Sequence, residues 1–142
     1  MPRLRHLLFC AVLVLLARAA HADLVLIAHL NSGIERLTQD EVINIYLGRY
    51  RRLASGIAAE PVDFPLDSEF RARFYRQLVN KNPAEINAYW ARLVFSGKTR
   101  PPTIIDTVDG VLKHVASQPG AVAYLERAQV DGRVKVVFEL GN

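Results

Sequence analysis

Residues 24–48 read LVLIAHLNSGIERLTQDEVINIYLG, and this stretch decides the type of fold. Its first five residues, Leu24 to Ala28, form a continuous apolar run that has the length of a buried strand. Thr38 and Glu41 follow as a capping box, in which each side chain binds the other's backbone amide, and Gly48 is placed to end the helix. A buried strand followed by a capped helix is the repeating unit of layered α/β domains.

The rest of the chain continues this alternation. Strands are predicted over Glu60–Phe64, Ala121–Leu125 and Arg133–Leu140, and helices from Asp67-Ser68 to about Asn80, from Asn82 to Gly97, and from Asp106 or Thr107 onward. In the second of these helices the spacing predicts one buried face, made of Ile86, Tyr89, Trp90, Leu93 and Val94. Arg100-Pro101-Pro102 is predicted as an extended linker. We therefore expect one α/β domain with a mixed sheet flanked by helices.

The first 22 residues have the pattern of a secretory signal peptide. Arg3 and Arg5 precede an apolar run from Leu7 to Leu16, and Ala20-His21-Ala22 has the small residues that signal peptidase requires. We expect cleavage before Asp23, which leaves a domain over residues 23–142 and no membrane span, because the apolar run is shorter than the ~20 residues that a spanning helix needs. Cys10, the only cysteine, lies in the apolar run, so the exported part is expected to hold no disulfide, thiolate metal site or thiol nucleophile.

The charge of the expected domain argues against a general nucleic-acid binder. The whole chain has a formal net charge of +4, but Arg3, Arg5 and Arg18 belong to the leader. Without them 15 basic residues face 14 acidic ones, a formal charge of +1. A nucleic-acid-binding domain is usually far more basic than this.

Three short motifs, in this order, resemble a known family. They are Ile45-Tyr-Leu-Gly48, the helix start at Asp67-Ser68, and Pro119-Gly-Ala-Val-Ala-Tyr124. Together the motifs resemble the phosphate-type substrate-binding proteins of ABC transporters, over about residues 24–140. The resemblance implies a type 2 periplasmic-binding-protein fold reduced to one lobe, without the amino-terminal segment of the full-length members. It also implies a periplasmic location and a small oxyanion, phosphate first, as the ligand.

In that family a helix N-terminus and a loop of small residues hold the phosphate, since unpaired amides and the helix dipole favour an anion. The resemblance places Ser68 and Arg71 as ligand-binding residues. Glu69 and Phe70 depart from the family's glycine and threonine, and Phe64 and Leu66 replace its arginine and aspartate. The other interpretation is that Asp67 and Ser68 only cap the helix and that Arg71 is solvated.

Other candidate residues are fewer. Arg49, Arg51 and Arg52 could hold an oxyanion or contact anionic lipid, although a solvated loop is the more common role of such a charge run. His29 and His114 lie far apart, so no metal site is predicted. Asp63 and Asp67 have no candidate nucleophile nearby, and the sequence contains no catalytic or cofactor-binding motif, which indicates a protein that is not an enzyme.

Two functions remain open from the sequence. The first is a periplasmic domain that binds phosphate or a related small oxyanion for ABC-type uptake. The second is an exported interaction or accessory module that kept the fold, lost the ligand and contacts an envelope protein. Glu69 and Phe70 favour the second, and Ser68 with Arg71 at a helix start favours the first.

Overall fold

The computed structural model describes residues 23–141. The predicted signal peptide, residues 1–22, lies outside them. Within this part of the chain, no helix has the length and apolar character needed to cross a membrane.

Strands and helices alternate as expected. The elements are β1 (Leu24–His29), α2 (Gln39–Tyr46), β2 (Glu60–Asp63), α3 (Glu69–Val79), α4 (Pro83–Phe95), β3 (Thr103–Ile104), α5 (Val108–Ser117), β4 (Ala121–Glu126), a 3-10 turn (Arg127–Gln129) and β5 (Val134–Glu139).

The helix boundaries follow local signals in the sequence. Both capping boxes form, at Thr38 with Glu41 and at Asn82 with Glu85. Thr107 caps α5, and Gly48 follows α2 with φ +72°, a conformation that favours glycine.

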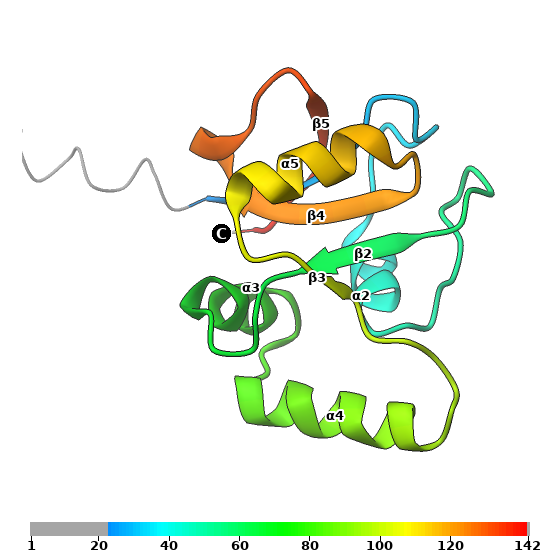
Figure 1. The fold of residues 1–142 in the computed structure, drawn as a ribbon, viewed down its shortest axis with the longest axis vertical. Coiled ribbons are helices and arrows are strands. Elements are labelled where there is room, and N and C mark those ends of the chain that lie inside the picture. Colours follow the sequence, from blue (N-terminus) through cyan, green and yellow to red (C-terminus); the bar gives the residue numbers. More distant parts are fainter. Residues whose placement is uncertain (1–22, 142) are drawn as a thin grey trace, which may run out of the picture.

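The five strands form one mixed sheet in the order β3-β2-β4-β1-β5 (Figure 1). β1 is antiparallel to both β4 and β5, whereas β2 is parallel to β3 and to β4. The central strands β1 and β4 are almost entirely buried. This confirms the predicted α/β class with a mixed sheet flanked by helices.

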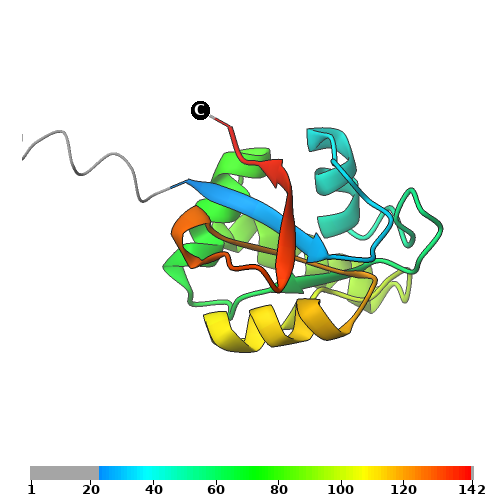
Figure 2. The same cartoon turned by 90° about the horizontal axis from the view of Figure 1, so that it is seen from above.

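Helices cover both faces of the sheet. Figure 2 shows α5 on one side of the sheet and α2 with α3 on the other. The core on the α2 and α3 side is aromatic, and its largest fully buried side chains are those of Tyr46, Tyr75, Tyr124 and Phe74. α4 packs on α3 at the lower end of the molecule in Figure 1 and is the most peripheral of the helices.

One strand was not predicted from the sequence, and one predicted burial pattern is wrong in part. Thr103 and Ile104, directly after the predicted linker, pair with Val62 and Asp63 as the edge strand β3. Two residues are too few to show a periodic pattern in the sequence. They form a strand only because β2 lies next to them and supplies hydrogen-bond partners. In α4, Ile86 and Trp90 are buried but Val94 is 53% exposed, because only the amino-terminal two thirds of the helix has a neighbour to pack against.

Candidate functional site

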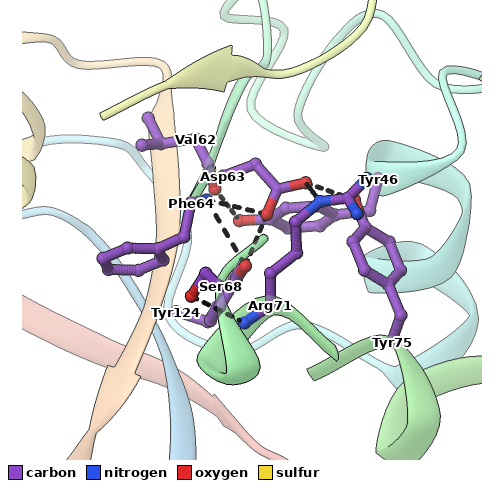
Figure 3. A network of polar contacts seen from close by, with 8 residues as sticks. All are labelled: Tyr46, Val62, Asp63, Phe64, Ser68, Arg71, Tyr75 and Tyr124. Carbon is purple, nitrogen blue, oxygen red and sulfur yellow. Dashed lines mark hydrogen bonds and ion pairs between the residues drawn. The ribbon is translucent and has the colours of Figure 1, made fainter. Parts of the chain in front are cut away.

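Strand β2 carries a carboxylate at each end, and the two carboxylates lie in different surroundings. Asp63, the last residue of β2, is 1% exposed. Its carboxylate accepts hydrogen bonds from the Tyr75 hydroxyl at 2.6 Å, from the Phe64 amide at 2.8 Å and from the Tyr124 hydroxyl (Figure 3). A buried carboxylate is stable only when such donors replace the water that it has lost.

Arg71, from the first turn of α3, completes this cluster. Its Nε lies 3.3 Å from Oδ2 of Asp63, and the side chains of the two residues are 3% and 2% exposed. The guanidinium also lies over the ring of Tyr75, 5.0 Å from its centroid. Within the described residues its Nη1 has no hydrogen-bond partner. The charge of Arg71 is therefore neutralised inside the protein.

The tyrosines of the cluster are held in their neutral form. Burial raises the pKa of Tyr75 and Tyr124, and the negative charge of Asp63 raises both further. The same two causes raise the pKa of Tyr46, whose hydroxyl donates to the Val62 carbonyl at 2.8 Å. All three hydroxyls can therefore donate hydrogen bonds across the physiological pH range.

Ser68 has the role of a helix cap. It is the N-cap residue of α3, and its Oγ accepts a hydrogen bond from the Arg71 amide at 3.3 Å. The second interpretation from the sequence expected Ser68 to cap the helix and Arg71 to be solvated. Its prediction for Arg71 is wrong, because that side chain is buried and forms an ion pair with Asp63. Asp67 and Glu69, on either side of Ser68, are exposed. An anion at this helix start would meet two carboxylates and no unpaired cation, and each carboxylate would repel it by about 1 kcal/mol at short range in water.

A groove of about 700 Å³ opens at the other end of β2. It lies between the carboxyl end of α2, the segment after it, and the chain between α4 and β3. Three cationic side chains line it, those of Arg51, Lys98 and Arg100, together with one carboxylate, that of Glu60. Glu60 Oε1 lies 2.8 Å from His114 Nε2 and 3.4 Å from Thr103 Oγ1. The cations thus outnumber the acid, and the acid already has partners within the protein.

The three arginines of the predicted anion-binding run, Arg49, Arg51 and Arg52, lie in three different places in the structure. Arg51 lines the groove and donates from Nη2 to the Lys98 carbonyl. Arg52 turns back to the carbonyl of Gly56 in its own loop, at 2.9 Å. Arg49 lies against Asn44, 3.4 Å away, and lines a different hollow between α2 and α4. Only one of the three therefore reaches the groove.

The histidines are also far from forming a joint site. His29 Nδ1 accepts from the Asn31 amide at the end of β1, whereas His114 lies on α5 beside Glu60. In the part of the chain that the structure describes, no group of three His, Cys, Asp or Glu side chains is placed to hold a metal ion.

Two functional features were missed from the sequence. The sequence places Lys98 just beyond a helix and Arg100 in a linker, and the folded chain brings both opposite Arg51 in the groove. Asp63 was considered as a catalytic carboxylate and set aside, but its role as the centre of a buried cluster was not seen. An aspartate at the end of a strand, followed eight residues later by an arginine in a helix, was the available signal.

Comparison with known proteins gives similarity at the level of structure. No protein-family model matches the chain, and no curated protein is significantly similar to it in sequence. Three solved structures align with 83–84% of it. An ABC-type phosphate transport receptor from Vibrio cholerae has a TM-score of 0.66 at 15% identity, and a putative phosphate ABC transporter substrate-binding protein from Clostridium perfringens, solved with bound phosphate, has 0.66 at 20%. PstS from Borrelia burgdorferi has a TM-score of 0.64 at 12% identity.

The aligned region is 46%, 45% and 47% of those three chains, so this protein spans less than half of their length. The fold predicted from the motif order is confirmed, while ligation by Ser68 and Arg71 stays a prediction. With its five-stranded mixed sheet and flanking helices, the chain has the fold of the phosphate-type substrate-binding proteins.

Proposed function

We propose that this domain binds a small oxyanion of the phosphate class, and that the anion lies in the groove at the amino end of β2. The observation that carries the proposal is the charge of that groove, where Arg51, Lys98 and Arg100 face a single carboxylate. The fold supports the ligand class, because the similar structures are described as phosphate transport proteins and one of them holds phosphate. A shared fold does not fix the position of a site, so the position is argued from charge.

The groove suits a small anion better than the start of α3 does. Guanidinium and ammonium groups donate charge-assisted hydrogen bonds to phosphate oxygens. At the start of α3, Arg71 already has Asp63 as its partner, and the cap uses Ser68 Oγ. The groove is open to water, where each close charge pair contributes about 1 kcal/mol. Three such pairs contribute about 3 kcal/mol, which predicts weak binding with a Kd of about 6 mM.

Calorimetry with inorganic phosphate at low ionic strength tests the proposal, since salt screens exposed charges. The double variant Arg51→Ala, Arg100→Ala is expected to weaken binding by about 30-fold, on the basis of about fivefold for each arginine. Arg52→Ala is the matched control, because this neighbouring arginine binds only its own loop. Sulfate as a second titrant reports selectivity.

The same titration distinguishes the two positions. Ser68→Ala should leave phosphate affinity unchanged and lower only stability, by about 1 kcal/mol, as expected for loss of an N-cap. A loss of affinity in Ser68→Ala with none in the arginine double variant would move the anion to α3. Absence of heat for phosphate and for sulfate at concentrations several times the expected Kd would reject oxyanion binding and favour an accessory module. A role in ABC-type uptake requires, in addition, co-purification with a permease.

A further inference from the structure

The near-neutral domain has a strongly polarised charge distribution. Residues 42–59 and 86–105 contain no aspartate or glutamate. They carry six cations, namely Arg49, Arg51, Arg52, Arg92, Lys98 and Arg100, all of them exposed. The remainder of residues 23–142 then holds 9 basic and 14 acidic residues, a formal charge of −5. Arg51, Lys98 and Arg100 line the groove, Arg49 and Arg92 line the hollow between α2 and α4, and Arg52 lies in the loop after α2. We call these six cations together the basic face.

A large apolar side chain projects beside this face. Phe95, the last residue of α4, is 95% exposed, and Val94 before it is 53% exposed. Tyr50, between two arginines of the basic face, is 49% exposed. Full exposure of a phenylalanine to water is unfavourable by about 2 kcal/mol relative to burial, so contact of Phe95 and the adjacent Val94 with an apolar phase or partner would be favourable.

The apolar tip and the basic face belong to one surface. Only Ser96 and Gly97 separate Phe95 from Lys98, and Gly97, with φ +69°, ends the helix there. The Lys98 carbonyl accepts from Arg51, which connects this turn to the segment after α2. In Figure 1 the chain leaves the end of α4 at the lower right and rises toward β2, so the tip lies at the periphery of the molecule.

We propose that this surface docks the protein on an anionic phospholipid bilayer, with Phe95 and Val94 entering the interface and the basic face lying against the headgroups. An interface of this kind accepts apolar side chains at shallow depth and attracts each nearby Lys or Arg by about 1 kcal/mol. A second copy of the chain fits less well, since a two-fold contact through this surface would bring six cations against six. The proposal goes beyond oxyanion binding, which does not involve Phe95.

Co-sedimentation with vesicles tests the proposal. The full chain is expressed with its leader, purified as the cell processes it, and its amino terminus is determined by mass spectrometry. We expect binding to vesicles of mixed phosphatidylglycerol and phosphatidylcholine and none to pure phosphatidylcholine. Phe95→Ala should lower the partition coefficient by about tenfold, from the loss of an inserted ring. Lys98→Ala should lower it by about fivefold, from the loss of one cation.

Matched variants control for folding and for the leader. Leu66→Ala removes another exposed apolar side chain, 61% exposed, but beside Asp67 and Glu69, and should leave the partition unchanged. Lys113→Ala removes a cation of α5, outside the basic face, and should change it little. All variants carry the same amino terminus, so binding by a retained leader would persist in Phe95→Ala. A blue shift of tryptophan fluorescence in Phe95→Trp on addition of anionic vesicles gives an independent readout.

Several outcomes would overturn the docking proposal, and one outcome would reject only the proposed oxyanion function. Equal binding to neutral and anionic vesicles, or binding that Phe95→Ala does not weaken, would reject it. Vesicle binding that depends on the cations but not on Phe95 would reject insertion of the apolar tip and indicate electrostatic adsorption to the headgroups alone. Phe95-dependent dimers in sedimentation, without vesicle binding, would assign the tip to a second copy. If phosphate gives no heat but the protein still binds anionic vesicles, only the proposed oxyanion function is rejected. If phosphate binds but the vesicles do not, only the docking proposal is rejected.

Discussion

Glu60 and Asp63 are three residues apart in β2, and their carboxylates lie at opposite ends of the same strand. Asp63 is buried and accepts hydrogen bonds from two tyrosines, an amide and an arginine. Glu60 is part-exposed and lies in a groove whose other charges are cations. At the carboxyl end of β2 the charged groups are therefore paired with one another inside the protein. At the amino end, the cations of the groove outnumber its one carboxylate.

This difference shows why the site in this chain cannot be placed by fold alone. A ligand often binds where a parallel strand ends and a helix begins. Here that position is filled by the protein's own groups, because Arg71 pairs with Asp63 and aromatic rings cover the pair. Cations without an internal acidic partner are what a ligand can use, and those lie around the groove and the end of α4.

The largest expected contrast is between two phenylalanines. Phe74 is fully buried and stacked on Tyr124, with ring centroids 3.8 Å apart, whereas Phe95 is 95% exposed. Phe74→Ala should lower the free energy of unfolding by about 4 kcal/mol, because it leaves a cavity. Phe95→Ala should change it by less than about 0.5 kcal/mol. Urea denaturation measures both. A large loss in Phe95→Ala would mean that the tip is packed in solution.

The two carboxylates of β2 provide the second test. Asp63→Asn removes a charge that balances buried Arg71, and it should lower the free energy of unfolding by about 3 kcal/mol. Glu60→Gln should cost less than about 1 kcal/mol, as is usual for part-exposed pairs such as that with His114. Chemical denaturation at neutral pH compares the two. Equal effects would contradict the description of Asp63 as the centre of a buried cluster.

Alkaline pH should affect the tyrosine cluster. The pKa values of Tyr46, Tyr75 and Tyr124 are raised in the folded protein by burial and by Asp63. The unfolded chain therefore loses these protons first, and stability is complete below pH about 10 and falls as the pH rises further. Between about pH 9 and about pH 10.5 the loss should be about 2 kcal/mol. Ultraviolet absorbance of tyrosinate should rise together with unfolding. Full tyrosine ionisation in the folded protein would contradict burial of the cluster.

The smallest effect concerns the two capping boxes. Thr38→Ala and Asn82→Ala should each weaken one helix by about 1 kcal/mol. Because α2 packs on the sheet and α4 is peripheral, Thr38→Ala should lower global stability, whereas Asn82→Ala should mainly speed amide hydrogen exchange within α4. Exchange rates measured by mass spectrometry separate the two outcomes. Equal protection of α2 and α4 would show that α4 unfolds only with the whole domain.

Much of the fold was predictable from residues 24–48 and the segments that repeat their pattern. Apolar runs, such as the continuous run Leu24 to Ala28 and the run Val134, Val136, Val137 and Phe138 around Lys135, gave the long strands within one residue or two. The edge strand β3 was not predictable, because its two residues carry no period of their own. The burial of Val94 was predicted wrongly, since spacing shows which residues share a helix face but not how far the neighbour beneath that face extends.

The candidate site was predictable only in its parts. The sequence drew attention to Arg51 within an arginine run and to Ser68 with Arg71 at a helix start. It did not place Lys98 and Arg100 opposite Arg51, since 47 residues separate Arg51 from Lys98. It also could not show that Arg71 is neutralised by Asp63, because that pairing depends on how α3 turns against the end of β2.

The sequence by itself determined what depends on neighbouring residues. Helix caps at Thr38, Ser68 and Asn82, the ends of the long strands and the alternating α/β order follow from hydrogen bonds and apolar patterns within a few positions. The tertiary structure decided which charges find partners. Asp63 and Arg71 neutralise each other, and Arg51 meets Lys98 and Arg100 in the groove, because charges interact through space and only the folded chain brings distant segments together.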